Sequence, residues 1–277
     1  MTTIVYHANC RDGFAAAWAI RVTYPEATFI AGNFGKPLEG FPFPGQDVIF
    51  ADFSLPREQM LEIAERAATL RVFDHHKTAE EALRDFPTFD GKVHIVFDME
   101  RSGAGISWDE LNPGVKRPWF IDYVEDRDLW RFKLPDSEAI NAWLGSLKFE
   151  FGAWSLQRVH EPHQVAQLGR AILAKTKAYV EEVGKNSYRA KDSAGRTLQI
   201  VNAPQVDVSE LLSDLLERNP SVDYSVGWWR RADGRFQYGL RSRPGSDVDV
   251  SAIAKGYHGG GHKHAAGFHL PILLEEW

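Results

Sequence analysis

Short apolar runs that stop at charged or polar residues recur through the N-terminal half of the chain. The runs cover residues 4–6, 28–31, 47–51, 70–73 and 93–97. They are rich in β-branched and aromatic residues and too short for core helices, so they predict strands. Because they are almost continuously apolar, the strands are expected to be buried on both faces, as in a parallel sheet.

Helical patterns separate these strands. An alanine-rich segment runs from Gly13 to Ile20, a second segment from Arg57 to Leu70 follows Pro56, and a third opens at Ser102 and ends at Leu111. Proline at the start of a helix costs nothing, because its missing N–H has no partner there. Strands that alternate with helices predict an α/β domain with a doubly wound parallel sheet.

The pattern changes towards the C-terminus. Strands are expected at 197–202, 224–229 and 236–240, helices at 209–218 and 250–255, and Asp233-Gly234 favours a hairpin turn. These elements predict a smaller α+β domain with a mixed sheet. The stretch from Ala139 to Gly184 is helical in pattern, which gives three parts: an N-terminal domain at 1–140, a helical connector at 141–190 and a C-terminal domain at 191–277.

Composition narrows the class of protein. The 277 residues are 44% hydrophobic and 25% charged, which is typical of globular chains and enough for two domains. A net charge of −6 argues against coating long nucleic acid or duplex DNA, since that requires neutralising many phosphates. Small anionic substrates remain compatible with a local basic cluster.

The single cysteine, Cys10, excludes an internal disulfide and fits a reducing compartment. The first residues lack the basic and apolar regions of a signal peptide, and no apolar run approaches membrane-spanning length. We therefore expect a cytoplasmic protein with no membrane partner. The sequence leaves a monomer and a homodimer equally open.

Ionisable residues follow several of the predicted strands. The residues are His7 and Asp12, then Asp52, then Asp74-His75-His76-Lys77, then Asp98, with a further acidic cluster at Asp122, Glu125, Asp126 and Asp128. Parallel strands present their carboxyl ends at one edge, and acidic groups that meet there repel unless a cation lies among them. Aspartate with histidine suits Mn²⁺, Zn²⁺ or Fe²⁺. Each residue alone has an ordinary explanation, such as a helix N-cap for Asp12, a buried histidine for His7 or a polar strand end for Asp74 to His76.

A second candidate site lies near the C-terminus. Gly259-Gly260-Gly261 precedes His262, and the small residues after it are expected to start a helix. Backbone N–H groups of such a loop can approach an anion closely. With Arg241 and Arg243 at the end of a nearby strand, the sequence favours a phosphate-binding pocket over a flexible turn.

These motifs together resemble a known family. In chain order they are His7 with Asp12-Gly13, Asp52, Asp74-His75-His76, Asp126, Leu240-Arg241-Ser242-Arg243, and Gly259-Gly260-Gly261-His262 with Ala265-Ala266-Gly267-Phe268. The set is similar to the Asp-His-His (DHH) phosphoesterase superfamily with its associated C-terminal substrate-binding domain, and it spans nearly the whole chain.

The resemblance implies a two-metal centre, most often Mn²⁺, with Mg²⁺, Co²⁺ or Fe²⁺ as alternatives, that hydrolyses phosphodiester or phosphoanhydride bonds. The metal ligands it implies are His7, Asp12, Asp52, His75 and Asp126, with Asp52 bridging. His76 would contact the scissile phosphate, and Asp74 would be a ligand or would orient His75.

The chain departs from the family pattern in the first motif. The first of two carboxylates is replaced, and Cys10 lies two positions before Asp12 with Asn9 beside it. One metal position is therefore weaker, or uses Cys10 and prefers softer ions. Asp128 is an alternative to Asp126, which aligns better with the family's aspartate and following aromatic residue.

The leading functional hypothesis is a two-metal-activated phosphodiesterase or exonuclease for short oligonucleotides, cyclic dinucleotides or nucleotide bisphosphates. In it, Arg101 assists at the phosphate, and Arg241, Arg243, Gly260, Gly261 and His262 bind the rest of the substrate. An inorganic pyrophosphatase is one alternative. A nucleotide-binding sensor that does not cleave is the other.

Overall fold

The computed structural model describes residues 1–274 and 277, and the chain divides into two compact units, Met1–Leu173 and Ala174–Trp277. Each unit has its own hydrophobic core. The boundary lies within helix α8 (Pro162–Gly184), in the stretch that the sequence assigns to a connector. The units are described separately below.

The first unit is built on a parallel five-stranded sheet in the order β2-β1-β3-β4-β5. The strands are β1 (Thr2–His7), β2 (Thr28–Gly32), β3 (Asp47–Ala51), β4 (Thr69–Asp74) and β5 (Val93–Phe97). The central strands β1, β3 and β4 are largely buried, as their apolar runs predict. The predicted doubly wound α/β architecture is confirmed.

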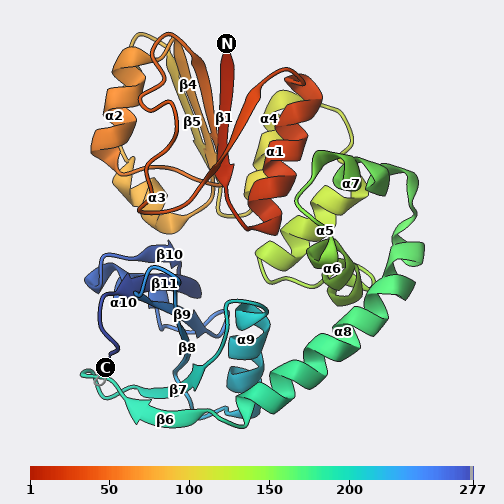
Figure 1. Cartoon of the computed structure of the whole chain (residues 1–277), viewed down its shortest axis with the longest axis vertical. Helices are drawn as coiled ribbons and strands as arrows, with labels where there is room; N and C mark the ends of the chain where they lie inside the picture. The colour runs from red at the N-terminus through yellow and green to blue at the C-terminus, as the bar shows by residue number, and fades with distance from the viewer. Residues whose placement is uncertain (275–276) are drawn as a thin grey trace. The chain divides into compact units, whose positions relative to one another are not determined.

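Helices cover both faces of this sheet (Figure 1). Helices α1 (Arg11–Thr23) and α4 (Gly103–Leu111) share a core with Ile4, Ile49 and Phe73, which point to one face of their strands. Helix α2 (Arg57–Arg66) packs with the residues of the opposite face, and α3 (Lys77–Ala82) follows β4 on that side. The alternation of strand side chains thus divides the interior into two apolar layers.

The helix predicted for Arg57–Leu70 ends four residues early, at Arg66. Ala67 is extended, and Leu70 pairs with both Val48 and Val93 inside the sheet. From sequence alone, the short apolar run that ends at Leu70 could continue the helix or begin a buried strand. The pairing of Leu70 with strands on both sides shows that it belongs to the strand.

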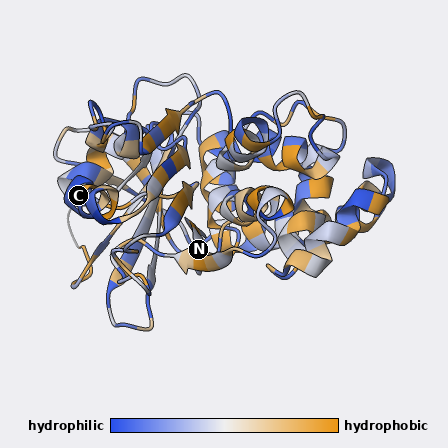
Figure 2. Ribbon diagram, turned by 90° about the horizontal axis from the view of Figure 1, so that it is seen from above, coloured by the Kyte–Doolittle hydropathy of each residue, from blue (hydrophilic) through white to orange (hydrophobic). Residues whose placement is uncertain are grey.

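The helical pattern after residue 118 forms a layer beside α1. It consists of α5 (Trp119–Asp128), α6 (Ser137–Ser146), α7 (Phe151–Ser155), the 3-10 turn η1 (Leu156–Val159) and α8. Phe120, Ile140 and Trp154 of this layer join the core that α1 shares with the sheet. In Figure 2 the helices carry hydrophobic and hydrophilic bands in alternation, as expected where one face packs and the other meets solvent. Within residues 1–274 and 277, no helix has both the length and the apolar character needed to cross a membrane.

The second unit holds a mixed six-stranded sheet in the order β10-β11-β9-β8-β7-β6, in which only β7 and β8 pair in parallel. The strands are β6 (Tyr188–Lys191), β7 (Thr197–Asn202), β8 (Tyr224–Arg230), β9 (Phe236–Ser242), β10 (Gly260–His262) and β11 (Ala265–Leu270), with helices α9 (Val208–Arg218) and α10 (Val250–Gly256). The predicted mixed sheet is confirmed. The helix start expected after the glycine loop is wrong, because residues 265–270 pair with β9 and β10 as a strand.

Candidate metal centre

The carboxyl ends of three adjacent strands gather ionisable side chains. His7 is the last residue of β1, Asp52 follows β3, and Asp74 is the last residue of β4. Tyr6 pairs with Ala51, and Ala51 with Phe73, so the three strands end at the same level. Ligands bind at this edge in open parallel sheets, and the shared register brings distant parts of the sequence together here.

His75 lies at the centre of the gathered carboxylates. Its Nε2 is 3.2 Å from Asp52 Oδ1, 3.3 Å from Asp128 Oδ2 and 3.6 Å from Asp12 Oδ2. His7 approaches from the other side, with its Nδ1 3.4 Å from Asp52 Oδ2. Asp52 therefore lies between two imidazoles that approach different oxygens of its carboxylate.

Two features of Asp52 cost folding free energy unless a ligand binds there. The residue is 1% exposed, yet neither carboxylate oxygen accepts a well-formed hydrogen bond. Its backbone is left-handed, with φ of 53°, a conformation that L-residues avoid and that clusters at functional sites. A buried carboxylate needs paired charge, so this position favours a cation at Asp52.

The pKa shifts of Asp12, Asp52 and His75 indicate an excess of buried negative charge around these three side chains. Burial, together with the neighbouring Asp52 and Asp128, raises the pKa of the Asp12 carboxyl well above its usual range. Burial acts in the same direction on Asp52, but the imidazoles of His7 and His75 hold its pKa well below the usual range. Burial opposes protonation of His75, and the surrounding carboxylates outweigh it and raise the His75 pKa well above its ordinary value. Protons thus balance charge that a divalent cation would otherwise balance.

The N-terminus of α4 fixes Asp12. The backbone N–H of Gly103 donates to Asp12 Oδ2 at 2.6 Å, and that of Ala104 donates to Oδ1 at 3.0 Å. Ser102 caps the same helix through its side chain, which accepts from Gly105 N. First-turn N–H groups lack helical partners and stabilise a carboxylate.

Two glycines allow the close packing at this edge. A Cβ on Gly103 would lie 2.5 Å from Asp52 Cβ and 2.9 Å from Asp12 Oδ2. A Cβ on Gly13 would lie 2.3 Å from the carbonyl oxygen of His7. Gly13, part of the first sequence motif, therefore lets α1 begin directly against the end of β1.

Asp74 orients His76 rather than His75. Its Oδ1 accepts hydrogen bonds from the backbone N–H of His75 at 2.7 Å and from that of His76 at 3.2 Å. The same oxygen lies 2.7 Å from His76 Nδ1. Because Nδ1 faces Asp74, the ring orientation of His76 is set and Nε2 lies on the opposite side. Asp74 contacts His75 through the hydrogen bond from the His75 backbone N–H.

Asp128, not Asp126, lies beside His75. The Asp126 carboxylate accepts from the backbone N–H groups of Lys133 at 2.9 Å and Leu134 at 3.2 Å, and so closes the loop after α5. The sequence preference for Asp126 therefore does not match the geometry. The two aspartates are separated by about 200° around a helix of 3.6 residues per turn, so only one of them can face the cluster.

Three groups of metal-ligating atoms occur within the first unit, each with its atoms within 4.8 Å of one another. They are His7, Cys10 and Asp52; Asp12, His75 and Asp128; and Asp52, Asp74 and His76. Asp52 belongs to two of them and its Oδ1 approaches His75 of the third. The donor set of imidazole, carboxylate and thiol fits a divalent transition metal.

Two arginines expected at a phosphate are engaged elsewhere. Arg101 Nε donates to Asp98 at 2.7 Å, and its Nη1 donates to Asp109 at 3.1 Å. Arg243 donates to the carbonyl oxygens of Leu216 and Asn219 at the end of α9 and to that of Val222. Cationic side chains commonly bind the last carbonyls of a helix, so Arg243 stabilises α9.

The remaining C-terminal candidates lie on neighbouring strands. Arg241, which is 9% exposed, pairs in register with Ala265 of β11, and Ala265 pairs with His262 of β10. A Cβ on Gly261 would lie 2.6 Å from the carbonyl oxygen of Ala265, so the hairpin requires glycine there. The structure therefore places Arg241 on β9 and Gly260, Gly261 and His262 on the edge strand β10, with β11 between the two strands.

Sequence reasoning missed Phe34, which follows β2 in a loop rich in glycine and proline. Its ring centroid is 5.4 Å from that of His7 and 6.4 Å from that of His76. The side chain is 54% exposed. No periodicity marks such a residue, and only its position beside the two histidines distinguishes it.

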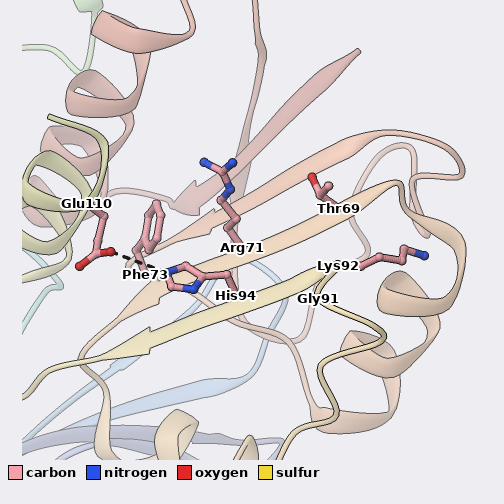
Figure 3. A pocket seen from close by; sticks show the side chains of 7 residues that line it. All are labelled: Thr69, Arg71, Phe73, Gly91, Lys92, His94 and Glu110. Atoms are coloured by element: carbon pink, nitrogen blue, oxygen red, sulfur yellow. Dashed lines mark ion pairs between the residues drawn. The ribbon is translucent and has the colours of Figure 1, made fainter. Parts of the chain in front are cut away.

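A recess elsewhere in the first unit lies along strands β4 and β5 (Figure 3). It has a volume of about 310 Å³ and is lined by Thr69, Arg71, Phe73, Gly91, Lys92, His94 and Glu110. The charged side chains that line the recess contact other groups of the protein. His94 lies 3.6 Å from Glu110, Arg71 donates to the hydroxyl of Tyr24, and Lys92 donates to a carbonyl of α2. None of these lining residues belongs to the metal-ligating groups.

Comparison with known proteins gives a fold and one distant relative. No family model matches the chain. An uncharacterized protein of Acanthamoeba polyphaga mimivirus is 29% identical over an alignment of 284 residues, gaps included, that covers 95% of this chain and 66% of that protein. The chain thus spans slightly less than two thirds of that relative's length.

Two solved structures share the architecture. The DHH domain of a member of a ribosomal protein family matches with a TM-score of 0.58 at 14% identity, covering 96% of this chain and 82% of that one. RecJ from Thermus thermophilus, in complex with Mn²⁺, matches with a TM-score of 0.52 at 13% identity, covering 97% of this chain and 49% of that one. At these identities the likeness is one of fold.

Proposed function

Because the chain has the fold of the DHH superfamily, we propose that it is a divalent-metal-dependent phosphoester hydrolase that acts on short nucleotidic substrates. The observation that carries the proposal is Asp52, a buried carboxylate without a well-formed hydrogen bond, placed between His7 and His75. The structural match to RecJ in complex with Mn²⁺ supports Mn²⁺ as the first ion to test.

Two metal positions are proposed, with Asp52 shared between them. His7, Cys10 and Asp52 would hold one ion, and Asp12, His75 and Asp128 would hold the other together with Asp52, whose Oδ1 lies beside His75. Such ions supply Lewis-acid stabilisation of phosphoryl oxygens and lower the pKa of a water molecule. The thiol of Cys10 occupies the place of a family carboxylate, so the His7 position is proposed to favour softer ions.

His76 is the proposed contact to the reacting phosphate. Burial opposes its protonation, but the charge of Asp74 outweighs this and raises the His76 pKa above its ordinary value. A protonated His76 held by Asp74 at Nδ1 can donate from Nε2 to a phosphate oxygen. Asp74 is thus proposed to position His76, with Lys77 adding local positive charge.

The C-terminal unit is proposed to recognise the remainder of the substrate. Arg241 on β9 carries the anion contact, with Gly260, Gly261 and His262 on β10, beyond the intervening strand β11. Arg243 and Arg101 are left out of the contact set, because their guanidinium groups bind carbonyls and carboxylates of the protein. Single anion contacts and a net charge of −6 favour short substrates over long nucleic acid.

A substrate panel tests the proposal. The full chain with Mn²⁺ is incubated separately with a 5′-phosphorylated dinucleotide, a cyclic dinucleotide, a nucleotide bisphosphate and pyrophosphate, and products are separated by length and charge. Consumption of a nucleotidic substrate is expected. Consumption of pyrophosphate alone would instead identify a pyrophosphatase, and micromolar binding without turnover would identify a nucleotide sensor, the alternative that the Cys10 replacement favours.

A matched pair of variants assigns the activity to the metal centre. Asp52→Asn keeps the size of the side chain and removes its charge, so metal binding and turnover should be lost. Asp90→Asn is the control, because Asp90 is exposed and has nearly the same backbone, with φ of 54° against 53°. Equal activity in the two variants would overturn the assignment of Asp52.

A further inference from the structure

The exposed ring of Phe34 borders the polar cluster. Single exposed hydrophobic side chains are common on protein surfaces and need no explanation by themselves. Phe34 differs because its ring lies edge-on to both His7 and His76, at interplanar angles of 65° and 75°. A flat apolar group is thus placed directly beside the residues proposed to bind metal and phosphate.

One face of the Phe34 site is formed by a buried aromatic side chain, Phe53, which contacts the Phe34 ring. Phe53, which is fully buried, lies with its centroid 4.7 Å from that of Phe34 and stacks on His7 at 6.1 Å. The loop approaches closely because residue 32 is glycine, whose added Cβ would lie 2.6 Å from the Phe53 ring. The contact with Phe53 restricts the Phe34 ring, which reduces the side-chain entropy that binding would cost.

A nucleotide matches this combination of surfaces. Its phosphate is anionic and its base is a flat π-system only a few bonds away through the sugar. Stacking on an aromatic side chain tolerates any base, because every base has a π-face. Pyrophosphate has no group that could cover the Phe34 ring.

We propose that Phe34 is a stacking platform for the base of the nucleoside attached to the reacting phosphate. The inference rests on the proposed function and adds its substrate class: the chain distinguishes nucleotidic phosphoesters from pyrophosphate within the first unit. Because stacking supplies the contact, the site selects for the presence of a base and little for its identity.

Titration calorimetry with Mn²⁺ present tests the platform without needing turnover. The probes are adenosine 5′-monophosphate and inorganic phosphate, and the proteins are wild type, Phe34→Ala and Phe34→Trp. We expect wild type to bind the nucleotide more tightly than phosphate. Phe34→Ala should weaken nucleotide binding by about tenfold and leave phosphate unchanged, since one base–aromatic stack is worth about that factor. Phe34→Trp should retain nucleotide affinity, and its indole fluorescence should change on nucleotide binding.

Phe149→Ala is the matched control. Phe149 is also an exposed phenylalanine, at 38%, but its ring packs on Phe14 and Trp154. Both affinities should be unchanged in it. Should Phe34→Ala fail to fold, Phe34→Leu keeps the apolar volume without a ring face, and the same loss of nucleotide binding is expected.

The outcomes separate this inference from the proposed function. Nucleotide affinity that is unchanged in Phe34→Ala, or that falls together with phosphate affinity, would overturn the platform. So would a wild type without preference for the nucleotide. A wild type that shows the base-dependent affinity but cleaves nothing in the substrate panel would overturn the proposed hydrolase and leave the platform standing.

Discussion

The Oδ2 atom of Asp12 accepts a 2.6 Å hydrogen bond from the backbone N–H of Gly103, which begins helix α4. This contact joins the first turn of α1 to the first turn of α4, residues that are 91 positions apart in sequence. It fixes one carboxylate of the cluster while the neighbouring Asp52 packs against the same glycine. The spacing of the proposed metal ligands therefore depends on a residue that has no side chain.

Gly103→Ala should disrupt the centre. The added methyl would lie 2.5 Å from Asp52 Cβ, so the start of α4 must move away. We expect a loss of stability of about 1–3 kcal/mol and weaker Mn²⁺ binding by calorimetry. Gly152→Ala in α7 is the control, because an added Cβ meets nothing within 4 Å there, and helix propensity should leave it as stable or more stable. Equal Mn²⁺ affinity in both variants would show that the α4 contact does not position Asp12.

Replacing Asp128 should mainly weaken metal binding, whereas replacing Asp126 should mainly lower stability. Asp128→Asn removes the carboxylate 3.3 Å from His75 Nε2 and should weaken Mn²⁺ binding by more than about tenfold. Asp126→Asn weakens the hydrogen bonds from Lys133 and Leu134 and should lower stability by about 1–3 kcal/mol while Mn²⁺ still binds. Metal content and thermal unfolding of the two variants measure the difference. If Asp126→Asn instead weakened Mn²⁺ binding and Asp128→Asn did not, Asp126 would be the metal ligand.

Cys10 should give a spectroscopic signature with Co²⁺. Thiolate coordination produces a charge-transfer band in the near ultraviolet that oxygen and nitrogen ligands lack. Wild type should show this band, and Cys10→Ser should lose it while retaining the visible Co²⁺ bands. Cys10→Asp, which restores a carboxylate, should bind Mn²⁺ at least as tightly as wild type. A wild-type Co²⁺ spectrum without the band would remove Cys10 from the ligand set.

The second unit should lose stability in acid through Asp192. Burial acts to raise the pKa of this carboxyl, but hydrogen bonds from Arg196 and from the hydroxyl of Tyr224 outweigh it and lower the pKa. Since the folded-state pKa is depressed, the stabilisation is complete above the unfolded value of about 3.9 and declines as pH falls through the folded one.

Chemical denaturation of wild type and Asp192→Asn between about pH 6 and about pH 3 measures this contribution. The difference in unfolding free energy between the two proteins should shrink as the pH falls. Asp90→Asn, an exposed aspartate in the other unit, serves as the control. A difference that stays constant with pH would contradict the role of the Asp192 carboxylate.

The fold was predictable from sequence because the central parallel strands β1, β3 and β4 are largely buried and so read as almost continuous apolar runs. The C-terminal ends of such runs mark the site, which is why His7, Asp52 and Asp74 could be named in advance. Residues on helices were harder. Asp126 and Asp128 lie two positions apart on α5, and only helix rotation decides which of them faces the cluster.

The contacts of arginines and of exposed aromatic residues could not be predicted from the sequence for a different reason. The sequence places Arg243 beside Arg241, but not the α9 carbonyls that Arg243 binds. Likewise, nothing in the loop after β2 indicates that Phe34 lies over Phe53. Roles of this kind depend on contacts between distant segments, which local patterns do not contain.

The clustered carboxylates at the strand ends also link folding to ion supply. An ion that binds only the folded chain at about 100 times its Kd stabilises that chain by about 2.7 kcal/mol. Asp12, Asp52 and Asp128 repel one another, and an ion at the proposed centre would offset that repulsion, so scarcity of the metal would lower the stability of the folded protein as well as slow the proposed chemistry. Cellular abundance of this chain would then follow the free concentration of its metal.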